Sequence, residues 1–236
     1  MKDITQKLAI FVDQESALEH IDTLSTNKGV KIIAFANAHA CNLCESNPEF
    51  KNALLHVDVL FRDGIGVKML LWFFGKQAGY NLNGTDLIPK IMQVHSSKRF
   101  VFIGSDKVSV TKASEVCINK GVNVVNHLDG FNDFPTMMSF IENNQPEYLV
   151  LGMGMPKQEL FSEYLKNHYS GDILIINGGA ILDFLSGKFT RAPEFVRKFG
   201  LEWLYRLMKE PLRLFNRYVI GIPIFLTKVI YARFFG

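Results

Sequence analysis

The sequence predicts an α/β fold in which a mostly parallel, Rossmann-like sheet carries helices on both faces. Between residues 30 and 187, short runs rich in β-branched and aromatic residues alternate with longer runs of helical periodicity. Two of the short runs, 100–104 and 173–177, are almost entirely apolar, which is typical of strands covered on both faces. Strands that alternate with helices in this way pair in parallel through right-handed crossovers.

The expected elements follow one another at regular intervals. Six strands are expected, at residues 31–36, 57–61, 99–104, 122–127, 148–152 and 173–177. Helical periodicity falls between them, at residues 46–55, 64–74, 86–95, 108–120, 135–144 and 156–168. The first half, about residues 30–96, contains more helix, and residues 99–187 form the more regular Rossmann-like half.

Composition divides the chain into a body and a C-terminal appendage. With 236 residues, 48% of them hydrophobic and 12% aromatic, the chain can bury a full core, which excludes a disordered protein. Residues 191–236 contain nine Lys/Arg and three acids, whereas residues 1–190 contain 17 Lys/Arg and 20 acids. Glycine and proline residues near 187–193 mark the boundary. We therefore expect one α/β domain at 1–195 and a helical appendage at 196–236.

The basic appendage is also rich in aromatic and aliphatic residues, a combination typical of segments that bind an anionic membrane surface. A transmembrane helix needs about 20 apolar residues. The longest uncharged run here, 218–227, has ten and contains Gly221 and Pro223. We therefore expect the appendage to lie on a membrane rather than to cross it. The alternative is a helix pair that docks its apolar face on the body. The basic residues form no recognised nucleic-acid-binding motif, so no nucleic-acid partner is expected.

The N-terminus and the cysteines indicate a cytoplasmic protein. The only early apolar run, residues 8–12, is too short for a secretory signal. Cysteines in the cytoplasm are reduced. Cys41 and Cys44 have the spacing of a redox motif or of half a zinc site, but no second pair completes four ligands. Together with Cys117 they are expected to be buried structural thiols, with a redox or metal role as the alternative.

Ligands of such sheets bind beyond the carboxyl ends of the strands, so the loops there are the candidates for chemistry. Asn37 follows the first strand and is either a ligand for a base or sugar hydroxyl or the N-cap of a helix. Asp63 follows the second strand and precedes Gly64 and Gly66, which permit close backbone approach. A carboxylate in that position is a helix cap or a catalytic group, and we favour the catalytic role.

Two later loops complete the set. The loop at 152–159 has the glycines Gly152 and Gly154 but lacks the third glycine of a dinucleotide fingerprint, which disfavours an NAD(P)-dependent oxidoreductase. Pro156 suits the first position of a helix, so Lys157 and Gln158 would lie at a helix start that binds anions and amides. The loop at 177–179 is expected to turn into a short helix.

These loops, in this order, resemble the WecG/TagA/CpsF glycosyltransferases (glycosyltransferase family 26), which extend polyprenyl-diphosphate-linked sugars in bacterial surface polysaccharides. The resemblance covers about residues 30–220. It rests on Asn47-Pro48 followed by Phe50, Asp63-Gly64-Ile65-Gly66, Gly84-Thr85-Asp86-Leu87, Gly152 and Gly154 with Pro156-Lys157-Gln158-Glu159, Gly178-Gly179 through Asp183 to Gly187, Arg191-Ala192-Pro193, and Gly200 through Trp203 and Arg206 to Glu210-Pro211 and Arg213.

The resemblance implies an inverting transfer of a sugar from a UDP-sugar to a polyprenyl-diphosphate-linked acceptor, without a metal ion or other cofactor. Asp63 would be the general base, and Arg206 and Arg213 would neutralise the diphosphates. The resemblance and the strand-end loops together predict the following substrate-binding residues: Asn37, Gly64, Gly84, Asp86, Gly104, Gly154, Lys157, Gln158, Gly178, Gly179, Arg191 and Arg217. The protein would be peripheral on the inner face of the cell membrane, with a homo-oligomer left open.

Two positions depart from the pattern of the family. Phe35 stands where members often carry Thr, and Asn81 stands where they often carry Arg. The departures leave the fold unaffected, but N-acetylmannosamine is not carried over as the transferred sugar, and a hexose or another N-acetyl sugar is equally open. They also suit a non-catalytic subunit that binds a nucleotide-sugar or lipid diphosphate. Retention of Asp63, Gln158 and the arginines favours the enzyme.

Overall fold

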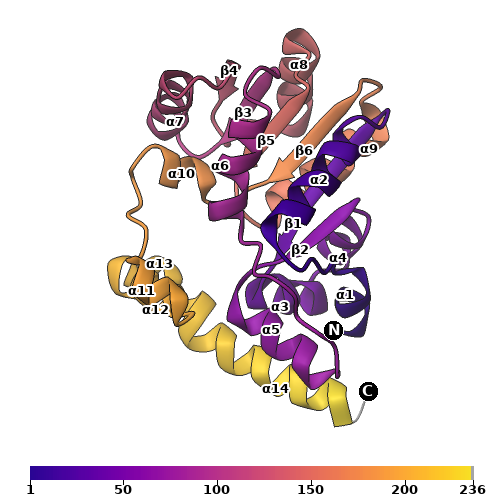
Figure 1. The fold of residues 1–236 in the computed structure, drawn as a ribbon, viewed down its shortest axis with the longest axis vertical. Coiled ribbons are helices and arrows are strands. Elements are labelled where there is room, and N and C mark those ends of the chain that lie inside the picture. The colour runs from indigo at the N-terminus through magenta and orange to yellow at the C-terminus, as the bar shows by residue number, and fades with distance from the viewer. Residues whose placement is uncertain (235–236) are drawn as a thin grey trace.

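The computed structural model describes residues 1–234, apart from the side chain of Lys198, and contains one six-stranded sheet with helices on both faces (Figure 1). Every pair of neighbouring strands is parallel, and their order is β2-β1-β6-β5-β3-β4. The strands are β1 (Val30–Ala36), β2 (Val59–Arg62), β3 (Phe100–Gly104), β4 (Val124–Leu128), β5 (Tyr148–Gly152) and β6 (Ile173–Asn177). The predicted fold class is confirmed, and all six predicted strands are present with ends shifted by at most two residues.

The helices of the body include the six that periodicity predicts. They are α1 (Lys2–Lys7), α2 (Gln14–Ser25), α3 (Ala38–Ser46), α4 (Pro48–Leu55), α5 (Gly64–Phe73), α6 (Gly84–Val94), α7 (Lys107–Asn119), α8 (Phe134–Asn144), α9 (Lys157–His168) and the short α10 (Ile181–Leu185) expected after the glycine pair. The helix predicted at 46–55 begins later, because Pro48 lacks an N–H and Asn47 caps the new helix by accepting from the Phe50 N–H at 2.9 Å. Sequence reasoning missed α1 and α2, and it offered α3 only through the alternative in which Asn37 is the N-cap of a helix.

The two faces of the sheet bury separate apolar clusters because successive side chains of a strand point to opposite faces. In β1, Ile32 and Ala34 pack on one face and Ile33 and Phe35 on the other. The first face is covered by α1, α3, α4, α5, α8, α9 and α14, and the second by α2, α6, α7 and α10. Apart from the edge strand β4, the sheet is therefore buried on both sides, and its strand ends are open to ligands.

The crossovers diverge between β3 and β5, because the chain leaves β3 toward β4 on one side and returns to β5 on the other. The carboxyl end of such a switch point is where sheets of this kind bind ligands. Gly104 and Gly152 are paired there. A Cβ on Gly104 would lie 2.4 Å from the carbonyl carbon of Gly152, and its φ of +148° also favours glycine. Gly104 thus permits the close approach of the two strands at this edge.

The C-terminal segment forms a series of helices that leaves the sheet and runs along α3 and α5 (Figure 1). It consists of α11 (Glu194–Lys198), α12 (Glu202–Lys209), α13 (Pro211–Phe215), the π-helical turn η1 (Asn216–Ile220) and α14 (Gly221–Phe234). Phe225 and Val229 are buried in the cluster under α3, and Asn42 Nδ2 donates to the main-chain O of Gly221 at 2.7 Å. The segment therefore docks on the body through these residues, as the alternative interpretation of its sequence predicts in part, and its binding to a membrane stays a prediction.

The last three of these elements form one continuous helix from Pro211 to Phe234. Gly221 and Pro223 interrupt its apolar run but do not end it. A π-helical turn lies directly upstream, and Pro223 is the third residue of α14, where it offers no N–H but the helix continues. Within residues 1–234, this 24-residue helix is long and apolar enough to cross a membrane by length and composition alone, with 17% of its most apolar window buried in the protein.

Candidate active site

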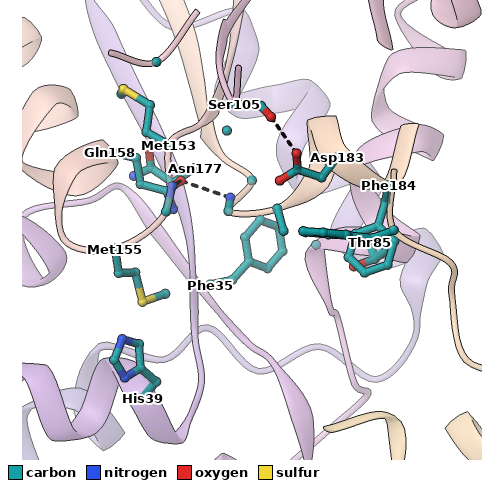
Figure 2. Close-up of a pocket in the computed structure, with 18 of the residues that line it drawn as sticks. Phe35, His39, Thr85, Ser105, Met153, Met155, Gln158, Asn177, Asp183 and Phe184 are labelled. Atoms are coloured by element: carbon teal, nitrogen blue, oxygen red, sulfur yellow. Dashed lines mark hydrogen bonds between the residues drawn. The ribbon is translucent and has the colours of Figure 1, made fainter. Parts of the chain in front are cut away.

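Two adjoining cavities lie at the carboxyl edge of the sheet. The first has a volume of about 490 Å³ and extends along the strand ends from Ser105 to Asp63. Figure 2 shows the part of it that contains Ser105, Gln158 and His39. The second has a volume of about 320 Å³ and lies between α3, α5 and the C-terminal helices. Six residues line both cavities, namely Asn37, His39, Asp63, Thr85, Arg206 and Arg217. These six mark the junction at which two ligands would meet.

The strand order arranges the polar groups of the first cavity in a row. Asp63 follows β2, Asn37 follows β1, Asn177 ends β6, Gly154 follows β5 and Ser105 follows β3. Neighbouring strands lie about 4.8 Å apart, so the row is about 19 Å long. An elongated ligand laid across these strand ends would have one end beside Asp63 and the other beside Ser105.

Asp63 is held by its neighbours while its carboxylate remains available. Its N–H donates to the O of Ala36 at 2.8 Å, and the next N–H, of Gly64, donates to Asn81 Oδ1 at 2.9 Å. The buried Arg62 guanidinium donates to the O of Gly64 at 3.2 Å. Asp63 occupies the N-cap position of α5, but its side chain accepts no capping hydrogen bond. The carboxylate is therefore not used as a helix cap, and it lines both cavities.

The pKa of the Asp63 carboxyl is raised above its ordinary value because burial disfavours the charged form. The guanidinium groups of Arg217 and Arg206 and a hydrogen bond with Asn37 oppose that rise. Asn37 Oδ1 also accepts from the Ala40 N–H at 3.1 Å and caps α3. Asn37 thus caps α3 and also lines both cavities, and its role as a ligand for a base or sugar hydroxyl stays a prediction.

Three arginines of the C-terminal helices form the wall opposite the strand ends. The guanidinium carbon of Arg206 lies 5.2 Å from the ring centroid of Phe184, and that of Arg213 lies 4.8 Å from that of Phe189. The Nε atoms of Arg206 and Arg217 are buried and have no hydrogen-bond partner among residues 1–234. Arg213 Nε donates to Glu210 Oε2 at 2.6 Å. Unpartnered guanidinium donors facing a cavity favour an anionic ligand.

Gln158 holds the two glycine loops of the site together. Its Oε1 accepts from the N–H groups of Gly154 and Gly179, at 3.1 Å and 3.0 Å. Its Nε2 donates to Glu159 Oε1 at 2.8 Å, and burial raises the pKa of Glu159 to about 7. Gly154 and Gly179 both have a positive φ, a backbone conformation that favours glycine. Gln158 therefore shapes the cavity wall through its neighbours as well as lining it.

The other expected binding residues fall into two groups. Gly84, Gly178 and Gly179 line the first cavity, and Gly64 lines the second. Gly104 ends β3 and lines neither cavity. Lys157, Asp86 and Arg191 line neither cavity: Lys157 Nζ donates to the main-chain oxygens of Gly130 and Asn132, and Arg191 pairs with Asp86. These three residues support the loops around the site.

Comparison with known proteins agrees with this arrangement. The model of the Glycosyl transferase WecG/TagA/CpsF family matches residues 7–236. The chain belongs to this family. It is 30% identical over 229 residues to the N-acetylglucosaminyldiphosphoundecaprenol N-acetyl-beta-D-mannosaminyltransferase of Bacillus spizizenii. The aligned region covers 93% of this chain and 88% of that protein. It is 25% identical over 223 residues to the protein of the same description from Staphylococcus aureus MRSA252, covering 92% and 87%. The protein is therefore a glycosyltransferase.

The glycosyltransferase also has cavity residues that sequence reasoning did not select. Ser105, with φ of +53°, donates through Oγ to Asp183 Oδ1 at 2.5 Å (Figure 2). Phe131 and Phe184 add apolar surface, and Asn177 lies in the same wall. Ser105 directly follows an apolar strand, so the strand-end rule was sufficient to find it. The two phenylalanines come from separate elements and carry no local signal.

The thiols of the glycosyltransferase are buried, as predicted. Cys41, Cys44 and Cys117 are unpaired, and burial raises the pKa of Cys41 to about 12 and those of the other two to about 11. Thiols in this state are poor nucleophiles and metal ligands. Among residues 1–234, no group of three or more His, Cys, Asp or Glu side chains is arranged to hold a metal ion.

Proposed function

We propose that this glycosyltransferase transfers a sugar, with inversion and without a metal ion, from a UDP-sugar to a polyprenyl-diphosphate-linked saccharide in the synthesis of a bacterial surface polysaccharide. The observation that carries the proposal is the junction of two cavities at Asp63, beneath Arg206 and Arg217. A transferase must bring two substrates together at one base. The names of the two relatives give a lipid-diphosphate sugar as acceptor and a mannosaminyl group as the one transferred.

The donor is assigned to the first cavity. Its nucleotide would lie toward β3 and β5, where Ser105 and Asp183 offer polar groups and Phe131 offers an apolar surface. The diphosphate would lie under Arg206 and Arg213, whose charges compensate its own. The transferred sugar would then reach toward the junction. This order follows the row of strand ends, which matches the elongated shape of a nucleotide-sugar.

Each proposed step uses a group placed at the junction. Asp63 accepts the proton of the acceptor hydroxyl, and the oxygen of that hydroxyl forms a bond to the anomeric carbon of the donor sugar. The bond between that carbon and the diphosphate oxygen breaks, and its electron pair leaves with UDP. Arg206, Arg213 and Arg217 stabilise the charge that develops on the leaving diphosphate. Attack opposite the leaving group inverts the anomeric centre.

The acceptor is assigned to the second cavity, which is lined by apolar side chains of α5 and the C-terminal helices. They include Ile65, Met69, Trp203, Ile222 and Leu226. The isoprenoid next to the diphosphate would contact this surface. Arg206 and Arg217, which line this cavity as well, would bind the acceptor diphosphate.

Exposed apolar residues of α5 and of the C-terminal helix form the surface that we assign to the membrane. They are Ile65, Met69, Trp72, Leu212, Phe215, Val219, Ile220, Ile224, Ile230, Tyr231 and Phe234. Leu212 is 95% exposed and Trp72 is 72% exposed. Lys209 and Arg233 add positive charge nearby, which favours anionic lipid. We infer that the appendage, 196–236, rests on the inner face of the cytoplasmic membrane.

The donor is proposed to be a UDP-sugar, and no particular sugar is assigned to it. Phe35 lines the first cavity, and Asn81 uses its Oδ1 to accept from the N–H of Gly64 beside the proposed base. Neither side chain offers the hydroxyl or the charge that family members often carry at these positions. The departures therefore change the surroundings of the reacting sugars while leaving Asp63 in place.

The test is turnover with defined substrates. Release of UDP would be measured with a panel of UDP-sugars and a short-chain prenyl-diphosphate N-acetylglucosamine, and thermal-shift assays would include UDP and NAD(H). Turnover with one donor supports the proposal. Binding of UDP and of the acceptor without turnover of any donor favours the non-catalytic subunit. Stabilisation by NAD(H) and not by UDP would contradict both.

A further inference from the structure

His39 lies at the junction of the two cavities and has no role assigned by the mechanism above. It occupies the second position of α3, directly after the loop that carries Asn37, and it lines both cavities. Figure 2 shows its ring below Met155, on the cavity side of α3. The ring nitrogens make no hydrogen bond or ion pair within residues 1–234, whereas the rings of His56, His127 and His168 each have a partner. A polar ring without a partner is thus placed where two substrates would meet.

The surroundings of His39 keep the imidazole neutral. Burial lowers its pKa to about 4, and the positive charge of Arg217 acts in the same direction. The first turn of a helix also disfavours a cation. A neutral imidazole has one N–H donor and one acceptor nitrogen. It is therefore suited to a sugar hydroxyl, which both donates and accepts, and poorly suited to a phosphate.

The position of the ring favours the acceptor rather than the donor. His39 belongs to α3, which packs on the same face of the sheet as α5 and α14, the helices that form the second cavity. The donor cavity extends away from this point toward β3, four strands from β2 in the sheet. Asp63, the proposed base, must contact the attacking hydroxyl from the same junction. A hydroxyl next to the attacking one would lie within reach of His39.

We propose that His39 forms a hydrogen bond to a hydroxyl of the acceptor sugar and so orients the attacking group toward Asp63. This inference rests on the proposed function and adds to it a specificity-determining residue for the acceptor. Because one hydrogen bond between neutral groups is involved, its removal should weaken acceptor binding by about 3- to 10-fold. Donor binding should be unaffected.

The experiment compares two variants of His39 with a control. His39→Leu removes both ring nitrogens at similar volume, and His39→Gln keeps a donor and an acceptor. His20→Leu makes the same change at an exposed histidine that lines neither cavity. Dissociation constants of UDP and of short-chain prenyl-diphosphate N-acetylglucosamine would be measured by calorimetry for the full-length protein and each variant.

We expect His39→Leu to raise the acceptor dissociation constant about 3- to 10-fold, His39→Gln to recover most of that loss, and His20→Leu to change nothing. The dissociation constant of UDP should stay within about twofold throughout, which also shows that the variants are folded. An unchanged acceptor constant in His39→Leu overturns the inference, as does an equal loss for UDP or a His39→Gln variant no better than His39→Leu. A wild-type protein that binds neither probe overturns the proposed function itself.

Discussion

Replacement of Asp63 by asparagine tests the base directly, because the two side chains have nearly the same shape and differ in charge and basicity. The carboxylate makes no capping hydrogen bond, so the change removes no helix cap. Loss of a general base costs about 10²- to 10⁴-fold in turnover, or about 3–5 kcal/mol in the activation barrier. UDP binding should remain, since the arginines that face the diphosphate are unchanged.

Stability gives an independent readout with a defined sign. The pKa of Asp63 is higher in the folded protein than its ordinary value of 3.8, because of burial. The folded state therefore binds this proton more tightly than the unfolded state, and ionisation destabilises the fold as the pH rises from about 3.8 to the folded pKa. Above that pH the penalty is complete, and the uncharged amide of the variant would not carry it. Asp63→Asn should unfold at pH 7 at the same temperature as the wild type or at a higher one.

The assay combines steady-state UDP release, UDP affinity and thermal unfolding on the same preparations. The wild-type kcat/KM should fall with decreasing pH along an acid limb that lies above pH 3.8, since the base must be ionised. Asp63→Asn with intact folding, intact UDP affinity and lost turnover supports the mechanism. Near wild-type turnover in this variant would refute the reasoning and leave Asp63 without a catalytic role.

Further predictions address the appendage and the metal. Arg206→Ala should lower turnover about 10²-fold or more while binding to anionic liposomes is kept; unchanged turnover would remove Arg206 from the diphosphate site. Leu212→Asp with Ile224→Asp, two exposed positions, should release the protein from liposomes and spare turnover on a short-chain acceptor, and retained sedimentation with liposomes would contradict the membrane surface. Phe225→Ala should lower the free energy of unfolding by about 3–5 kcal/mol in denaturant titration, because Phe225 is buried. Turnover should persist in EDTA, and its loss with rescue by Mg²⁺ or Mn²⁺ would exclude the metal-independent mechanism.

Much of the body was predictable because its signals are local. Apolar runs such as 173–177 are strands in any parallel sheet, and glycine or asparagine after a strand marks a turn or a cap within a few residues. The missed helix α2 also has a local signal, since Asp13 caps it by accepting from the Ser16 N–H at 2.8 Å. Only the short length of α1 leaves too little periodicity to detect.

The roles of polar side chains were harder to predict, because a charged group binds the nearest available partner in space. Lys157 begins a helix beside the site, yet its ammonium reaches the main-chain oxygens of Gly130 and Asn132. Asp86 and Arg191 stand 105 residues apart in the chain and pair with one another. From their residue types alone, these side chains could bind a ligand as well as pair within the protein. Only the packing shows that their charges are already compensated.

The sequence alone determined the α/β class, the order of the strands along the chain, the strand-end position of Asp63 and the basic, apolar character of the last helices. These properties depend on composition and on neighbours within a few residues. Only the tertiary structure decided the spatial order of the strands, the docking of Phe225 beside α3 and the meeting of Asp63 with Arg206 and Arg217 at the junction of two cavities. The physical reason is that contacts between residues so far apart in the chain depend on which apolar surfaces pack together. The number of residues between two positions does not tell how close they lie in space.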